Sequence, residues 1–239
     1  MAVLEHDSLP ASASRRDIAA WNEVMVDRYD IDRYYEDAHP IVRWIERRRL
    51  EALHRLAAVR PGERILEVGC GAGHVLAQFN GVTRFGIDLS PAMLERSRRR
   101  LAGGARLARA FADGLPFASA SFDVVLCTEV LEHTADPAAV ICELVRVGRP
   151  GARIIVSVPN ETNIDRAKRA IRRVPVLNRM LRTLAAEGNE WHLHDFDLAM
   201  LRRTVRGAAV IDALVAVPSR LMPVRYVARL GAAKRGGSP

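Results

Sequence analysis

Residues 65–73 read Ile-Leu-Glu-Val-Gly-Cys-Gly-Ala-Gly, and this stretch, with Asp88 fifteen residues after it, decides the fold of the chain. The first four residues have the pattern of a buried strand, and three glycines at alternate positions predict a turn whose backbone lies close to a ligand. Residues 74–79 are expected to continue as a helix. A strand, a glycine-rich turn and a helix in this order predict a nucleotide site.

The spacing of the glycines separates several nucleotide-binding motifs. A dinucleotide fingerprint requires Gly-x-Gly-x-x-Gly, but His74 stands at the position of its third glycine. No Lys-Ser/Thr pair follows the glycines, which excludes a phosphate-binding P-loop. Residues 67–73 instead have the pattern Glu-x-Gly-x-Gly-x-Gly. With this pattern the chain resembles the class I S-adenosylmethionine-dependent methyltransferases, strongly over residues 60–160 and weakly elsewhere.

The resemblance implies that S-adenosylmethionine is the cofactor and assigns residues to it. The glycines would pass beneath its methionine part, and Glu67 would orient the loop and the cofactor's ammonium group. Asp88 would accept both ribose hydroxyls, because a carboxylate has two acceptor oxygens. Asp113 would accept the adenine amino group, with Leu89 and Leu115 as apolar walls of the ring. The full implied set is Glu67, Gly69, Cys70, Gly71, Gly73, Asp88, Leu89, Asp113, Gly114, Leu115 and Thr128.

Strand and helix patterns alternate along the middle of the chain. Strands are expected at 64–68, 83–87, 106–112, 122–127 and 152–158, and helices at 74–79, 91–101 and 137–147. Alternation at this spacing predicts a parallel sheet with helices on both faces. Asp113 would then follow the third strand directly. Asp136 and Pro137 are expected to open the last of these helices, as its N-cap and first residue.

The C-terminal part adds a helix over 196–205 and strands over 209–217 and 224–230. The resemblance implies that these two strands pair as a hairpin, which completes an α/β, Rossmann-like, doubly wound sheet of seven strands, one of them antiparallel. The alternative is that 219–230 forms a basic amphipathic helix. The expected organisation is one domain, in the following parts: an N-terminal helical segment covering the site (1–60), the cofactor-binding core (61–160), a basic amphipathic insertion or cap (161–190), and the closing helix and hairpin (191–235).

Loops that follow parallel strands meet at one edge of a sheet, so catalytic groups are expected there. Methyl transfer from a sulfonium is an in-line displacement, and a base is needed only when the nucleophile carries a proton. His133, in the loop over 128–133, is the first candidate for a base or for substrate positioning, although it could simply tie down that loop. His192 and His194 are further candidates, and no metal is expected because a third ligand at suitable spacing is missing. Asp195 is expected to cap the following helix.

The insertion over residues 161–190 gives information about the molecule that accepts the methyl group. Its apolar and basic faces are typical of a cap over an apolar pocket, of docking on an anionic membrane surface, or of an ordinary helix pair at the sheet edge. Residues 128–131 read Thr-Glu-Val-Leu, unlike the Asn/Asp-Pro-Pro-Tyr/Phe run of base-modifying enzymes, and Cys127 lacks the preceding proline of cytosine C5 enzymes. The favoured hypothesis is therefore methylation of an O, N or C atom of a small molecule, as in enzymes that methylate quinones, sugars, lipids and antibiotics.

Three alternatives stay open. They are an RNA methyltransferase that uses the basic insertion, a non-catalytic cofactor-binding partner protein, and an NAD-linked oxidoreductase, which would share Asp88 but lacks the third glycine. The chain has 239 residues and a net charge of +8, but the arginine runs at 47–49 and 96–100 are expected to be solvated faces, so a small-molecule partner is favoured over nucleic acid.

Composition favours a cytoplasmic protein. No apolar run reaches the roughly 20 residues that a membrane span needs, and residues 1–16 lack the apolar core of a secretory signal. The three cysteines, Cys70, Cys127 and Cys142, form no Cys-x-x-Cys pair and are expected to be reduced thiols. The acceptor and the oligomeric state lie beyond what the sequence indicates.

Overall fold

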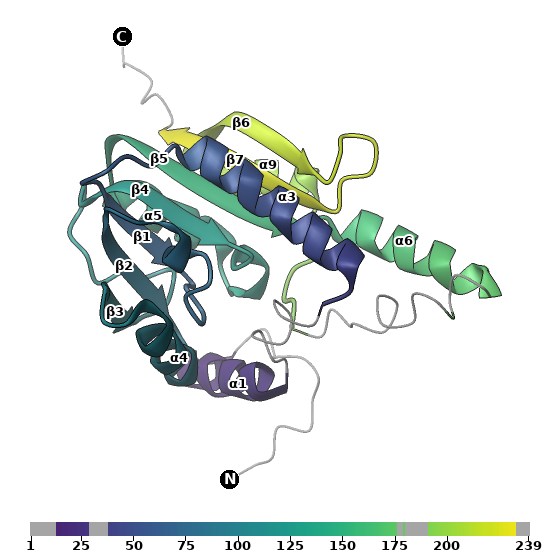
Figure 1. The fold of residues 1–239 in the computed structure, drawn as a ribbon, viewed down its shortest axis with the longest axis horizontal. Coiled ribbons are helices and arrows are strands. Elements are labelled where there is room, and N and C mark those ends of the chain that lie inside the picture. Colours follow the sequence, from purple (N-terminus) through teal and green to yellow (C-terminus); the bar gives the residue numbers. More distant parts are fainter. Residues whose placement is uncertain (1–12, 29–37, 176–178, 180–190, 233–239) are drawn as a thin grey trace.

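A seven-stranded sheet forms the centre of the molecule, and helices cover both of its faces (Figure 1). The computed structural model describes residues 13–28, 38–175, 179 and 191–232. The strands are β1 (Arg64–Val68), β2 (Thr83–Asp88), β3 (Ala105–Arg109), β4 (Phe122–Thr128), β5 (Gly148–Pro159), β6 (Ala209–Val217) and β7 (Arg225–Ala232). The α-helices and 3-10 turns (η) are α1 (Arg15–Arg28), α3 (Pro40–Ala57), η1 (Leu76–Gln78), α4 (Pro91–Leu101), η2 (Leu131–His133), α5 (Pro137–Val147), α6 (Glu161–Arg173) and α9 (Leu198–Val205).

The strand order is β3-β2-β1-β4-β5-β7-β6. Pairs among β1 to β5 are parallel, whereas β7 runs antiparallel to both β5 and β6. The order reverses between β1 and β4, and in open α/β sheets ligands bind beyond the carboxyl ends of the strands at such a point. The predicted Rossmann-like sheet with one antiparallel strand is confirmed. The alternative of a helix over 219–230 is wrong, because Arg225–Ala232 is a strand.

β4 shows why both faces of the sheet are covered. Val125 and Cys127 pack in the apolar layer that includes side chains of α5 and α9. Val124 and Leu126 point to the opposite layer, which includes side chains of α3. All four side chains are fully buried. A strand without a polar face is typical of parallel sheets and explains the continuous apolar run in the sequence.

Two helices begin as the sequence predicts. The Asp136 carboxylate accepts hydrogen bonds from the N–H groups of Ala138 and Ala139, both at 3.0 Å, and Pro137 is the first residue of α5. α4 has the same construction, with a serine cap before a proline. A proline at the first helical position lacks only an N–H that would have no partner inside the helix.

Two of the expected boundaries near the site are wrong. Residues 74–79 contain no α-helix but one 3-10 turn, because Val75 at its start offers no side-chain cap and the chain turns away again at Phe79. The third strand ends at Arg109 and not at 112. Arg109 pairs with Asp88, the last residue of β2, so the ladder has no partner beyond that point. Asp113 therefore lies in a turn after the strand.

The start of α9 also differs from its prediction. Asp197 is the N-cap, and its carboxylate accepts the N–H of Met200 at 2.7 Å, so Asp195 is not the cap. Phe196, between Asp195 and Asp197, is fully buried. Burial of this side chain orients the segment so that Asp197 lies at the start of α9. α6 forms the first part of the predicted insertion, while residues 176–178 and 180–190 lie outside the described part of the chain. Among the described helices none is both long and apolar enough to cross a membrane.

Candidate functional site

The glycine-rich loop after β1 forms one wall of the candidate cofactor site. Gly69, Gly71 and Gly73 have φ angles of 70°, 49° and 81°, in the left-handed region that favours glycine. A Cβ atom at Gly69 would overlap the Val130 side chain, and one at Gly73 would come within 2.7 Å of the Ser97 hydroxyl. A Cβ atom at Gly71 would meet no atom of the described residues within 4 Å. The outer two glycines are therefore required by packing, and the middle one faces open space.

Asp88, the last residue of β2, fixes this loop from the side. Its Oδ2 accepts the N–H of Gly71 at 2.8 Å, and its Oδ1 accepts the N–H of Ser90 at 2.9 Å. Burial raises the pKa of Asp88, while these two hydrogen bonds act in the opposite direction. Each carboxylate oxygen has two lone pairs, so both retain capacity for a further donor. A vicinal diol could supply that pair of donors.

Glu67 lies at the end of β1, beneath the loop, and is 2% exposed. Its Oε2 is buried without a hydrogen-bond partner among the described residues. Burial raises the pKa of Glu67 to about 8, and the charge of Arg49 lowers it only in part. A buried acceptor without a donor is costly, so this carboxyl is suited to a ligand that brings a donor with a positive charge.

Asp113 faces the N-terminal helix. Its Oδ1 lies 3.1 Å from a guanidinium nitrogen of Arg15, whose guanidinium also lies over the ring of Phe111, 4.7 Å from the ring centre. Arg15 is 59% exposed, and ion pairs this accessible contribute little to stability. An incoming amino group could therefore displace Arg15 at small cost. Leu115 is buried, and its N–H donates to Glu143 at 2.7 Å.

Four further residues implied by the resemblance lie along the same edge of the sheet. Cys70 is buried, with its N–H donating to the carbonyl of Ile87 at 2.9 Å. Leu89 is half-buried, Gly114 is exposed and Thr128 is buried at the end of β4. The fold thus brings together the ends of β1, β2 and β4 and the turn after β3.

Two segments distant in sequence pack beside the glycine loop. Val26 of α1 forms a small apolar cluster with Ala72 of the loop and Met93 of α4, and Trp191 packs against it. The N-terminal helix and the segment that leads to α9 therefore meet at the rim of the candidate site. This contact agrees with the expectation that the N-terminal segment covers the site, which stays a prediction.

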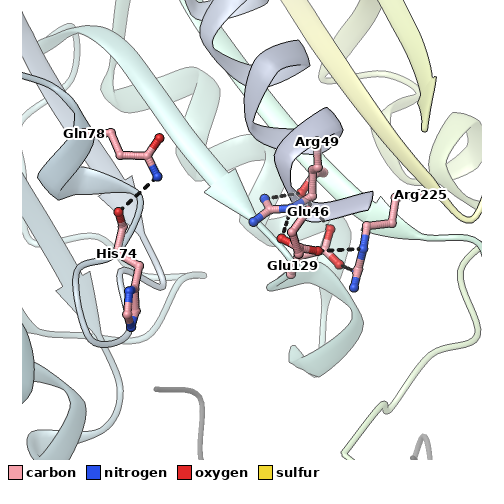
Figure 2. A network of polar contacts seen from close by, with 7 residues as sticks. Glu46, Arg49, His74, Gln78, Glu129 and Arg225 are labelled. Atoms are coloured by element: carbon pink, nitrogen blue, oxygen red, sulfur yellow. Dashed lines mark hydrogen bonds and ion pairs between the residues drawn. The ribbon is translucent and has the colours of Figure 1, made fainter. Parts of the chain in front are cut away.

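An ionic network built around a buried Glu46–Arg49 pair lies on the other side of the site, at the ends of β4 and β5 (Figure 2). Glu46 on α3 accepts from Arg49 at 2.9 Å and lies 3.1 Å from Arg225 on β7. Arg225 also pairs with Glu129, which directly follows β4. Ser157 donates to Glu129 at 2.7 Å and lies 3.5 Å from a guanidinium nitrogen of Arg49. The network ties α3, β5 and β7 to the residue that follows β4.

The expectation that residues 47–49 form a solvated face is wrong for Arg49, which is 1% exposed. A signal for this was present in the sequence. Arg49 stands four residues before Leu53 and seven before Leu56, on the apolar stripe of α3, with Glu46 three residues before it. An acid and a base at this spacing on an apolar stripe indicate a buried pair.

The three candidate histidines lie together at the rim but have different environments. His133, in η2, has its Nδ1 3.0 Å from the carbonyl of Trp191, and its ring centre is 4.9 Å from that of His192. Burial and the neighbouring His192 lower the pKa of His133 to about 3, so its ring is neutral. His192 has its Nδ1 2.8 Å from Oε1 of the buried Glu161. His194 Nε2 instead lies 2.9 Å from the carbonyl of Thr134.

Comparison with known proteins agrees with this arrangement. Residues 66–156 match a family model described as a methyltransferase domain. The chain is 41% identical over 118 residues to the ubiquinone biosynthesis O-methyltransferase of Hahella chejuensis. The matched stretch covers 47% of this chain and 49% of that protein. It is 31% identical over 153 residues to the 27-O-demethylrifamycin SV methyltransferase of Amycolatopsis mediterranei, covering 59% of this chain and 56% of that protein.

A solved S-adenosylmethionine-dependent methyltransferase from Mesorhizobium loti has the same fold, with a TM-score of 0.57, 21% identity and coverage of 75% of this chain and 95% of that chain. The matches to the two curated relatives span only about half of the length of those proteins. Over residues 66–156 the chain is similar to this methyltransferase family, and its fold is that of the solved enzyme.

Proposed function

We propose that the chain transfers a methyl group from S-adenosylmethionine to a nucleophilic atom of a small molecule, with oxygen the favoured atom among O, N and C. The observation that carries this proposal is the convergence of Glu67, Gly71 and Asp88: an unpartnered buried carboxyl oxygen, a backbone that leaves space, and a carboxylate with acceptor capacity left. The two curated relatives described above are named as an O-methyltransferase and as the methyltransferase of a 27-O-demethyl compound, which favours oxygen.

The residues fit the cofactor in three places. Glu67 offers its free oxygen to the ammonium group, Asp88 offers one further acceptor on each oxygen to the ribose diol, and Asp113 can exchange Arg15 for the adenine amino group. The bound cofactor supplies a methyl group that is already activated by its sulfonium. The protein then contributes mainly by holding the acceptor in line with that group and by excluding water.

His133 is a poor general base at the position the structure gives it. Its pKa of about 3 makes the neutral ring a weak proton acceptor, since the driving force for proton transfer to it is small. His133 therefore serves the acceptor side by positioning in this proposal, and the acceptor's proton leaves by another route.

The test is transfer of labelled methyl from S-adenosylmethionine to panels of phenols, quinols and hydroxylated antibiotics, with bulk RNA as a separate panel. Asp88→Asn should lower cofactor affinity by about 10- to 100-fold, the value of a hydrogen bond to a charged acceptor. Asp123→Asn, at the opposite end of β4, where the acid pairs with Arg149, is the matched control and should leave affinity unchanged.

The other outcomes of this test would support a different function for the chain. Binding to RNA that falls steeply with ionic strength, with methyl in the RNA, would favour the RNA methyltransferase. Cofactor binding without transfer to either panel would favour a non-catalytic partner protein. Equal affinity of the Asp88 variant and the wild type would contradict the proposed site.

A further inference from the structure

Glu132, His133 and His192 gather beyond the carboxyl ends of β4 and β5, although 59 residues separate the two histidines in the sequence. One ligand atom from each of the three lies within 4.8 Å of the others. The expectation of no metal rested on the lack of a third ligand near the His-x-His pair. The fold instead brings two residues of a different loop, Glu132 and His133, to one histidine of that pair, His192.

One atom of this cluster has no role in holding the fold. Oε2 of Glu132 is buried and has no hydrogen-bond partner among the described residues, and the residue is 1% exposed. A buried carboxyl oxygen without a donor costs free energy unless a proton or a cation satisfies it. Each of the two neighbouring imidazoles has one ring nitrogen within 4.8 Å of the carboxylate ligand atom. A bound cation would satisfy all three groups at once.

The histidines are oriented as metal-binding histidines usually are. Nδ1 of His133 lies 3.0 Å from the carbonyl of Trp191, which fixes the proton on that nitrogen and leaves the Nε2 lone pair free. Glu161 holds the other ring, its Oε1 lying 2.8 Å from Nδ1 of His192, although the alignment falls short of a hydrogen bond. A carbonyl or a carboxylate behind each ring is the usual outer support of a metal-binding imidazole.

Backbone hydrogen bonds hold the three segments in place. The N–H of Leu193 donates to the carbonyl of Glu132 at 2.8 Å, and the N–H of Glu161 donates to the carbonyl of Phe196 at 2.9 Å. The cluster is thus built by the fold and is not a chance meeting of surface side chains. In bound zinc sites the ligand atoms lie about 2.0–2.2 Å from the ion. Closing on a tetrahedral ion therefore requires separations of up to 4.8 Å between the ligand atoms to shorten to about 3.4 Å, which side-chain rotation can supply.

We propose that Glu132, His133 and His192 bind a divalent transition-metal cation, with Glu161 holding His192 in place. Two imidazoles and a carboxylate suit zinc, manganese and ferrous iron, and are poorly suited to calcium or magnesium, which prefer oxygen ligands. His194 takes no part, because its Nε2 faces the carbonyl of Thr134.

The position suggests a use, which rests on the proposed function. A cation beside the end of β4 would bind the acceptor's hydroxyl and favour its ionised form. The hydroxyl proton would pass to solvent. The oxygen lone pair would then form the O–CH3 bond as the C–S bond of the sulfonium breaks, with its electron pair remaining on sulfur.

The test is calorimetric titration of the untagged, chelator-treated full chain with MnCl2 and then ZnCl2. Manganese is the first probe because it binds thiolates poorly, and Cys142 is exposed. One equivalent should bind per chain. His192→Ala and the nearly isosteric Glu132→Gln should each lower the affinity at least about tenfold. His194→Asn, the matched control in the same His-x-His pair, should leave it unchanged, with melting temperature as the check of folding.

Absence of saturable binding of both ions would overturn the proposal, and so would equal losses in the His194 and His192 variants. If the His192 variant does not fold, the Glu132 variant decides. Binding of S-adenosylmethionine is measured in the same samples. Cofactor binding without metal binding contradicts only the metal site, whereas metal binding without cofactor binding contradicts the proposed function.

Discussion

Binding of S-adenosylmethionine should release a proton from Glu67 at neutral pH. Burial raises the pKa of this carboxyl from 4.5 to about 8, so in the free protein it carries a proton at pH 7. A cofactor ammonium group placed at its unpartnered oxygen favours the ionised form and so expels the proton. Affinity should therefore rise with pH up to about 8, by about 50-fold in all between pH 6 and pH 8, as the ionised fraction of the free carboxyl rises.

The variant Glu67→Gln distinguishes the proton released by Glu67 from protons released by other groups. The variant keeps the shape of the side chain but cannot ionise, so its affinity should be nearly independent of pH below 7. At pH 8 it should bind about 10- to 100-fold more weakly than the wild type, the value of a lost charge-assisted hydrogen bond. Near pH 6 the two proteins should converge, because the wild-type carboxyl is then neutral as well.

The assay is calorimetry at pH 7 in two buffers with different ionisation enthalpies, which counts released protons directly. The wild type should release about 0.9 proton more than Glu67→Gln, since a group with a pKa of about 8 is roughly 90% protonated at pH 7. The ligand's own amino group titrates near 7.7–8.0, but it contributes equally to both proteins. Equal proton release, or wild-type affinity that is flat from pH 6 to pH 8, would refute the assignment of Glu67.

Two further predictions use neighbouring residues as controls. Gly71→Ala and Gly62→Ala both place alanine at positive φ, with no atom of the described residues within 4 Å of its Cβ. Both substitutions should therefore cost about 1–2 kcal/mol of stability. Only Gly71→Ala should weaken cofactor binding in a calorimetric titration. Arg49→Ala should lower the free energy of unfolding in urea by about 3–5 kcal/mol, because it leaves Glu46 buried without its closest partner, whereas Arg48→Ala on the exposed face should change it by less than about 0.5 kcal/mol. Similar affinity losses in the glycine pair, or similar stability changes in the arginine pair, would contradict these assignments.

The core of the fold was predictable because its signals are local. β1, β2 and β4 are short apolar runs with acids or glycines at their ends, and α5 begins with an N-cap aspartate and a proline. Such features depend on residues within a few positions of one another. The positions of Glu67 and Asp88 at one sheet edge followed from topology, since the carboxyl ends of parallel strands meet there.

The remaining parts depend on partners far away in the sequence. Glu46 and Arg49 are buried only because Arg225 and Glu129, from β7 and the end of β4, complete the network. The end of β3 was overestimated because a strand stops where its neighbour stops, which its own sequence does not show.

The histidine cluster was missed for the same kind of reason. His133 and His192 were each identified as candidates, but their meeting with Glu132 depends on the path of the chain after β5. Spacing along the sequence reveals metal ligands only when they lie on one element or one loop. Here two segments far apart in the sequence contribute the ligands, and their convergence became visible only in the fold.

The most direct test of the central claim is a crystal structure of the chain with S-adenosylhomocysteine, the demethylated product. The ribose hydroxyls are expected within hydrogen-bonding distance of Asp88, the amino group at Glu67 and the adenine beside Asp113 in place of Arg15. A nucleoside bound elsewhere, or one at this edge of the sheet with the Asp88 and Glu67 carboxyls turned away from it, would contradict this assignment.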